Sequence, residues 1–249
     1  MRCAAYIVAV LATSADARPV HDRVWLAPTA ELPAEGDVLG AISLDRHGGF
    51  DMTGGYGFGG IAELELAIAN SDARLCDPCS PLERSTATFR FGAREDDLFE
   101  GAPALVLGVQ AGFDAHASGL HATEAYVVAT RHIAAVTLHA GVAATATGHD
   151  NSAATTVVRP LAGVELIPPA FPKTTLLADV SWQPKFTTTA MTTAVESTSE
   201  LAFAWGVRYQ TFPWLAVELA VRHDASAFGD PDVLVRVTGQ WGTGTLRPR

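Results

Sequence analysis

The chain has 249 residues, of which 48% are hydrophobic and 18% charged, and its formal net charge is −10. That charge argues against a nucleic-acid binder, because such proteins need a basic surface to contact phosphates. The sequence contains no uninterrupted run of about 18 apolar residues, so it offers no transmembrane helix. A chain this apolar is therefore either a packed soluble protein or one in which apolar and polar residues alternate.

The N-terminus has the features of a bacterial signal peptide. Arg2 precedes an apolar stretch from Cys3 to Ala12, and Ala15-Asp16-Ala17 matches the small-x-small cleavage pattern. A first buried strand is the alternative interpretation of the apolar stretch. We expect residues 1–17 to be cleaved and residues 18–249 to form the exported domain.

From about residue 36 onward, apolar and polar residues alternate in segments about ten residues long. This is the length that a tilted strand needs to cross a bilayer, whereas sandwich strands usually have about 5–6 residues. The segments are 38–46, 58–69, 84–94, 103–114, 122–132, 134–147, 157–167, 175–184, 200–209, 215–222 and 233–238. The pattern predicts an all-β fold, a single antiparallel transmembrane β-barrel in the bacterial outer membrane. A soluble periplasmic lipocalin-like binding barrel, with its apolar faces inward, is the alternative.

The connections between these segments alternate in length, as the short periplasmic turns and long outer loops of bacterial barrels do. Short ones fall at 131–134, 167–174 and 212–214, and longer ones at 70–83, 114–121, 148–155, 184–199 and 224–232. Tracing the alternation back assigns the turn at 46–51 to the periplasm. An even barrel with a periplasmic N-terminus then needs one more strand upstream, for which Val20 to Ala27 is the candidate. The sequence therefore predicts about twelve strands, with ten as the second choice.

Aromatic residues are distributed as interfacial girdles would require. Phe171, Phe212, Trp214 and Trp241 fall at the expected periplasmic ends of strands. Trp205 falls in the middle of a segment, where it could instead be an ordinary core residue.

If the apolar faces meet lipid, the opposite faces line the lumen. The charged residues on those faces are Asp45, Glu63, Glu65, Arg90, Arg94, Arg159, Glu165, Asp179, Glu200, Arg208, Glu218, Arg222 and Arg236. An isolated buried charge is costly, so these residues are expected to pair across strands. Their signs are nearly balanced, whereas a strongly selective channel would show one sign in excess. This favours a self-paired lumen over a path that contacts a substrate.

Two cysteines remain after removal of the signal peptide, Cys76 and Cys79 in the sequence Cys-Asp-Pro-Cys. An exported chain meets an oxidising compartment, so we expect a small loop disulfide. Free or metal-bound thiols are the alternative, but a zinc site would need two further ligands at a suitable spacing.

A few residues suggest chemistry without forming a recognisable site. His116 and His121 fall in one expected outer loop, near Ser118 and Glu124, but no G-x-S-x-G motif accompanies them. An outer-membrane hydrolase is therefore the less favoured interpretation, and we expect neither an enzyme nor a cofactor. The acidic run at 95–97 lacks the spacing of a calcium loop and is expected to be a solvated turn.

The glycine-rich stretch at 54–60 contains no Lys-Ser/Thr pair. It is therefore expected to be a mobile or tightly turning hairpin edge, and not a phosphate-binding loop.

Three blocks of sequence resemble the YjbH-like outer-membrane barrels. They are 104–110 with 119–131, Pro160 to Glu165 with the Pro168-Pro169 turn and Leu176 to Asp179, and Gly206 to Tyr209 leading into Pro213 to Leu215. That family is associated with exopolysaccharide production and secretion. The resemblance implies a passive transport, export-accessory or structural role at the outer membrane, with polysaccharide or export machinery as partners.

Overall fold

A computed structural model of the protein describes residues 23–46, 48–74, 81–114, 120–149, 155–188, 195–225 and 230–242. The expected signal peptide, Cys76, Cys79, His116 and Ser118 lie outside this part of the chain. No helix among the described residues is long and apolar enough to cross a membrane. Within them the chain forms twelve strands: β1 (Val38–Asp45), β2 (Phe50–Phe58), β3 (Ala62–Arg74), β4 (Pro81–Ala93), β5 (Ala104–Asp114), β6 (Leu120–Ile133), β7 (Val136–His149), β8 (Thr155–Leu166), β9 (Thr174–Thr188), β10 (Val195–Phe212), β11 (Leu215–Asp224) and β12 (Asp232–Trp241).

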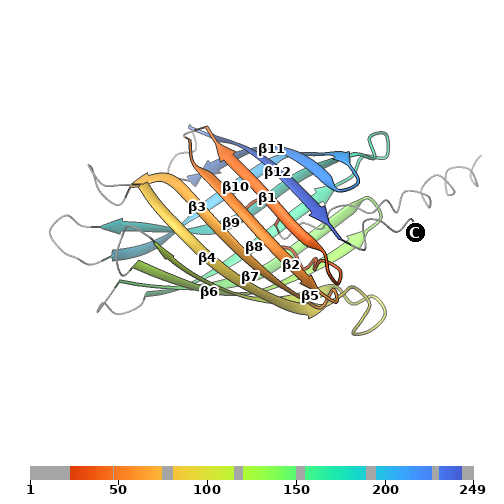
Figure 1. Cartoon of the computed structure of the whole chain (residues 1–249), viewed down its shortest axis with the longest axis horizontal. Coiled ribbons are helices and arrows are strands. Elements are labelled where there is room, and N and C mark those ends of the chain that lie inside the picture. Colours follow the sequence, from red (N-terminus) through yellow and green to blue (C-terminus); the bar gives the residue numbers. More distant parts are fainter. Residues whose placement is uncertain are drawn as a thin grey trace, which may run out of the picture.

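The strands close into one antiparallel barrel. Each strand pairs with its neighbours in sequence, and β1 pairs with β12 from Val38↔Trp241 to Asp45↔Leu234. Figure 1 shows β1 (orange) beside β12 (dark blue), with the strands tilted across the long axis of the molecule. Closure pairs every strand on both sides and so removes the exposed edges that would invite aggregation. The predicted single barrel and its twelve strands are confirmed.

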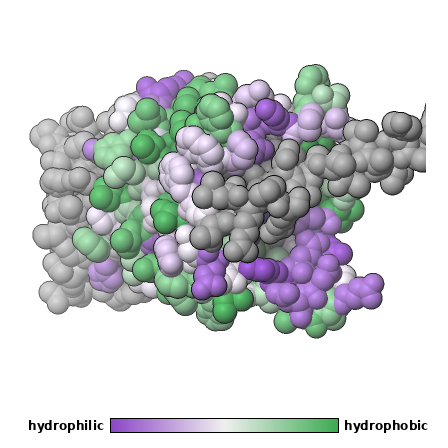
Figure 2. Space-filling view, turned by 45° about the vertical axis from the view of Figure 1, so that its right-hand side comes forward, coloured by the Kyte–Doolittle hydropathy of each residue, from purple (hydrophilic) through white to green (hydrophobic). Residues whose placement is uncertain are grey.

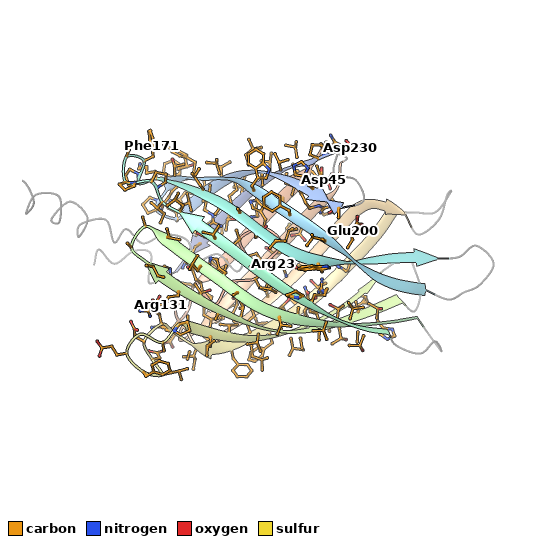
Figure 3. The ribbon with its side chains drawn as sticks, turned by 180° about the vertical axis from the view of Figure 1, so that it is seen from behind. Arg23, Asp45, Arg131, Phe171, Glu200 and Asp230 are labelled. Atoms are coloured by element: carbon orange, nitrogen blue, oxygen red, sulfur yellow. The ribbon has the colours of Figure 1, made fainter. Side chains whose placement is uncertain are left out.

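The two ends of the barrel differ in their connections. Turns at 59–61, 134–135 and 213–214 lie at the end where β1 begins and β12 ends. Figure 3 shows Arg131 and Phe171 at this end, and Asp45 and Asp230 toward the other. Short turns identify the periplasmic end of an outer-membrane barrel, so β1 begins and β12 ends on the periplasmic side, as predicted.

Two details of the predicted strand assignment are wrong. The connection from β1 to β2, expected on the periplasmic side, lies at the outer end. The twelfth strand is β2 and not Val20 to Ala27. The alternation of apolar and polar residues is weak in β2, because glycines occupy inward positions. At Gly57 a Cβ atom would lie 2.4 Å from the carbonyl oxygen of Ala34, so glycine lets another part of the chain pack directly on this strand.

The outer face of the wall is apolar. Large side chains there remain widely exposed, including Leu66 (60%), Trp205 (49%) and Leu219 (54%). Figure 2 shows hydrophobic residues over much of the visible wall. A soluble protein rarely exposes so large an apolar surface, and a lipocalin would have it inside. The soluble alternative is therefore wrong, and the chain is a barrel of the bacterial outer membrane that contacts lipid.

An aromatic girdle marks the periplasmic end of this apolar band. The Phe212 and Trp214 rings stack with their centroids 5.6 Å apart, and the Trp214 and Trp241 centroids are 5.8 Å apart. Phe171 is 65% exposed in the turn after β8. Amphipathic rings of this kind lie at the level of the lipid headgroups.

Candidate functional site

The residues before β1 fold back into the barrel. Val24, Ala27 and Thr29 have no exposed surface, and Figure 3 shows Arg23 between the two ends of the barrel. The N–H of Val24 donates to the carbonyl of Ala27 at 3.0 Å, and an isolated bridge joins Arg23 to Pro28. The tip is therefore a tight turn inside the lumen. We call residues 23–33 the luminal segment.

Asp179 on β9 holds the tip of the luminal segment. Its Oδ2 accepts the N–H groups of Trp25, Leu26 and Ala27 at 2.8, 2.6 and 2.9 Å. Successive N–H groups that point at one anion form a cradle for negative charge. Hydrogen bonds to an ionised acceptor are also stronger than neutral ones, so one carboxylate fixes the whole turn.

Arg236 on β12 holds the other side of the tip. One of its terminal nitrogens donates to the carbonyls of Arg23 at 3.3 Å and Val24 at 2.5 Å, and pairs with Glu218 on β11 at 2.7 Å. The guanidinium also lies over the Trp25 ring, 4.4 Å from its centroid, which is close enough for a cation–π contact. The tip is thus bound through both its donors and its acceptors.

Closer to the periplasmic mouth, two further strands contact the segment. Arg90 on β4 donates to the carbonyls of Thr29 at 2.5 Å and Glu31 at 3.1 Å, and pairs with the buried Glu63 at 2.7 Å. The hydroxyl of Thr130 on β6 accepts the N–H of Ala30 at 2.8 Å. Together β4, β6, β9 and β12 contact the segment from different sides of the wall.

The last contact of the segment is electrostatic and lies near the periplasmic end. Glu31 Oε1 is 3.3 Å from His132 Nε2, and His132 Nδ1 is 2.6 Å from Glu95 Oε2 in the turn after β4. Burial disfavours the charged form of Glu31, but the hydrogen bond from His132 and the electrostatic attraction of His132 and His139 together hold the pKa of Glu31 below its ordinary value. His132 thereby joins the segment to the periplasmic turn.

The acidic run lies in a solvated turn after β4, as expected, with Asp96 and Asp97 exposed. Asp96 accepts from Arg131 at 3.1 Å and from the N–H of Gly101 at 2.8 Å. The Arg131 hydrogen bond lowers the pKa of Asp96, and the Gly101 N–H adds to this. Among the described residues, no group of His, Cys, Asp and Glu could hold a metal ion.

Most of the predicted lumen-lining residues are on inward faces. Those buried inside are Glu63, Glu65, Arg90, Arg159, Arg208, Glu218 and Arg236, and Glu165, Glu200 and Arg222 are partly buried there. Arg208 lies 3.1 Å from both Glu165 and Glu218, and Arg159 pairs with Glu124.

Arg94 does not line the lumen. Alternation ends at Ala93, and the Arg94 side chain is exposed in the turn, where it donates to the carbonyls of Gly59 and Gly60.

Apolar side chains in the lumen also meet the segment. Val24 and Trp25 cluster with Leu177, Ala204 and Ala220. Ala27 and Ala30 form a second cluster, with Ala104, Val106, Tyr126, Val128, Ala143 and Leu161. Without the segment, these inward apolar residues would face water in a polar lumen. The sequence carried one signal for the segment, because Pro28 and Pro33 lack the N–H that a wall strand must donate.

The outer half of the lumen is uneven in charge. The unevenness lies in one sector of the wall, formed by the neighbouring strands β10, β11, β12, β1 and β2. Among the described side chains, the inward face of this sector carries five carboxylates and one arginine, Arg222, near the outer end. The carboxylates are Asp45, Asp51, Glu200, Asp224 and Asp232. The sequence did not predict this excess of negative charge, because acidic and basic residues are nearly balanced over the whole lumen but not within this sector.

The described residues proposed for hydrolase chemistry do not converge. His121 follows the outward-facing register, opposite the exposed Phe113. Glu124 faces the lumen, where it accepts from Thr145 at 2.8 Å and pairs with Arg159.

Comparison with known proteins supports the fold. No family model matches the chain, and no curated protein matches it. Among solved structures it is similar to the KdgM porin in complex with disordered oligogalacturonate, at a TM-score of 0.57 and 6% identity, over 83% of this chain and 98% of that one. It is also similar to the KdgM porin alone, at a TM-score of 0.52 and 7% identity, over 83% and 98%. At such identities the likeness concerns the outer-membrane barrel fold, and the YjbH-like resemblance rests on sequence motifs alone.

Proposed function

We propose that this protein is a passive outer-membrane channel for small hydrophilic solutes whose lumen is closed by the luminal segment in the state described. The observation that carries the proposal is the charged lumen. Glu63, Arg90 and Glu218 are all but fully buried inside the wall, and burying charge is costly compared with packing apolar side chains. Polar interiors of this kind occur in outer-membrane barrels that enclose a water-filled channel or a lumen closed by another part of the chain.

The charge of the outer half bears on the solute. KdgM was solved with an oligogalacturonate, an acidic sugar chain. In this protein the sector from β10 to β2 would repel such a chain through Asp45, Asp51 and Asp232. We therefore propose neutral or cationic solutes, and expect cations to be more permeant than anions under a salt gradient.

A structural or export-accessory role is the second candidate. The observation that favours it is the luminal segment, which occupies the periplasmic half of the lumen and is contacted from β4, β6, β9 and β12. The YjbH-like resemblance implies the same role, with polysaccharide or export machinery as partners. A disulfide between Cys76 and Cys79 is proposed on the sequence alone.

Conductance in a planar bilayer separates the two candidates. A passive channel should show discrete unitary steps, separated by closed intervals in which the segment fills the lumen. Their reversal potential in a salt gradient should indicate preference for cations. A correctly folded barrel that stays silent over long recordings, in the wild type and in variants with weakened segment contacts, would rule out the channel and leave the structural role. Heat-modifiable migration on a denaturing gel provides the folding control.

A further inference from the structure

The luminal segment is bound in an unusual way, because charged side chains of the wall form hydrogen bonds with its backbone on both sides. Asp179 accepts three N–H groups, and Arg236 and Arg90 donate to four carbonyls. In a packed core, specificity comes from the shapes of side chains. Here the wall presents an acceptor and donors spaced to match a peptide backbone.

We propose that the wall around Asp179, Arg236 and Arg90 is a peptide-binding site, and that the luminal segment, residues 23–33, occupies it reversibly. The ligand is a short peptide with three consecutive free N–H groups at a tight turn and an aromatic side chain next to the guanidinium of Arg236. The inference goes beyond the proposed channel, because it holds whether or not the empty lumen conducts ions.

The wall is suited to both the filled and the empty state. If the segment leaves, Asp179 and Arg236 lose their backbone partners but face a polar lumen where water can replace them. Arg236 keeps its ion pair with Glu218, and Arg90 keeps its pair with Glu63. The wall ladder from β1 to β12 is complete without the segment, so its departure breaks no strand pairing.

The apolar clusters explain why the site is normally filled. Leu177, Ala204 and Ala220 are covered by Val24 and Trp25, so departure exposes apolar surface to water. Burial of that surface favours the bound state in proportion to its area. Backbone contacts orient the peptide, and the apolar contacts supply the drive to bind.

Cysteine labelling of the full chain tests the exchange. Val24→Cys, in a Cys3→Ser/Cys76→Ser/Cys79→Ser background, introduces a smaller side chain at a position with no exposed surface. A water-soluble maleimide should modify this thiol slowly and to completion, because it becomes accessible only when the segment leaves. Asp179→Asn removes the charge that three N–H groups contact, and should accelerate labelling by about ten-fold or more. Glu124→Gln, at a lumen carboxylate whose partners Thr145 and Arg159 belong to the wall, is the matched control and should not.

A free peptide tests whether the site binds in trans. A synthetic peptide of residues 23–33, added at millimolar concentration to compete with the tethered segment, should accelerate labelling of Val24→Cys in a saturable way. The same peptide carrying Leu26→Pro lacks one of the N–H groups that Asp179 accepts and should not.

The proposal is overturned if the thiol is never modified in the folded barrel, if Asp179→Asn leaves the labelling rate unchanged, or if the two peptides act alike. If the thiol is labelled but the barrel never conducts, the channel proposal is refuted and the peptide-binding site stands. If the barrel conducts but the thiol is never labelled, the peptide-binding site is refuted and the channel proposal stands.

Discussion

The barrel wall and the luminal segment are parts of one chain that are stabilised in different ways. In the wall, each strand forms a continuous ladder with two neighbours, as from Val38↔Trp241 to Asp45↔Leu234. The luminal segment has one isolated bridge, between Arg23 and Pro28, and otherwise depends on side chains of distant strands. A ladder is cooperative and cannot open locally without large cost, whereas a handful of polar contacts can. The comparison indicates that wall and segment have separable stabilities.

The largest expected effect comes from breaking the wall's buried charge network. Glu218 has no exposed surface and pairs with Arg208 at 3.1 Å and Arg236 at 2.7 Å. Glu218→Ala leaves two buried guanidiniums without this partner and should lower the free energy of unfolding by about 3–5 kcal/mol. The measurement is urea-dependent unfolding in lipid vesicles.

Arg222→Ala is the control for that experiment. Arg222 and Asp224 are each about one-third exposed, so losing this pair should change stability by at most about 1 kcal/mol. If the free energy of unfolding fell equally in the two variants, burial of Glu218 would not strengthen its ion pairs, and the prediction would be wrong.

A smaller effect is expected on the lipid side of the same strand. Leu219 lies in the middle of β11 and is 54% exposed on the outer face. Leu219→Arg places a charge near the bilayer midplane, which should destabilise the barrel by about 2–4 kcal/mol. Phe171→Arg, in the periplasmic turn, should be nearly neutral. If Leu219→Arg were tolerated equally well, the apolar band would not be the lipid-contacting surface.

The smallest effect concerns the segment alone and depends on pH. The folded pKa of Glu31 lies below its ordinary value, which is about 4.3 for an unfolded chain. The contact with His132 therefore contributes fully above that pH and is lost as pH falls through the lower folded value. Channel openings in a planar bilayer should become more frequent as pH falls from about 5 toward 3.

Glu31→Gln should raise the opening frequency already at neutral pH and remove this acid response. Glu35→Gln, at an exposed position nearby, is the matched control and should retain it. Wild-type openings that become rarer on acidification would contradict the role of Glu31 in holding the segment.

The sequence predicted the wall well because alternation is a local property. In β7, Leu138 and Val142 face outward while Thr137, His139 and Thr145 are buried inside, as a period of two requires. Even so, alternation does not predict β2, since its small inward residues Gly55 and Gly57 weaken the polar half of the pattern. Arg94 was misplaced because a period says where residues face but not where the strand ends.

What the sequence by itself determined is therefore the transmembrane barrel, eleven of its twelve strands and the inward position of most of its charges, because each depends on a repeat that neighbouring residues carry. Only the tertiary structure decided that the residues before β1 enter the lumen. Their contacts with Asp179 and Arg236 join positions more than 150 apart in the chain, and no local pattern records a partner at that distance. The same is true of the acidic sector, which exists only once β1 closes on β12. Local periodicity builds the wall, and closure of the wall creates the site that the luminal segment occupies.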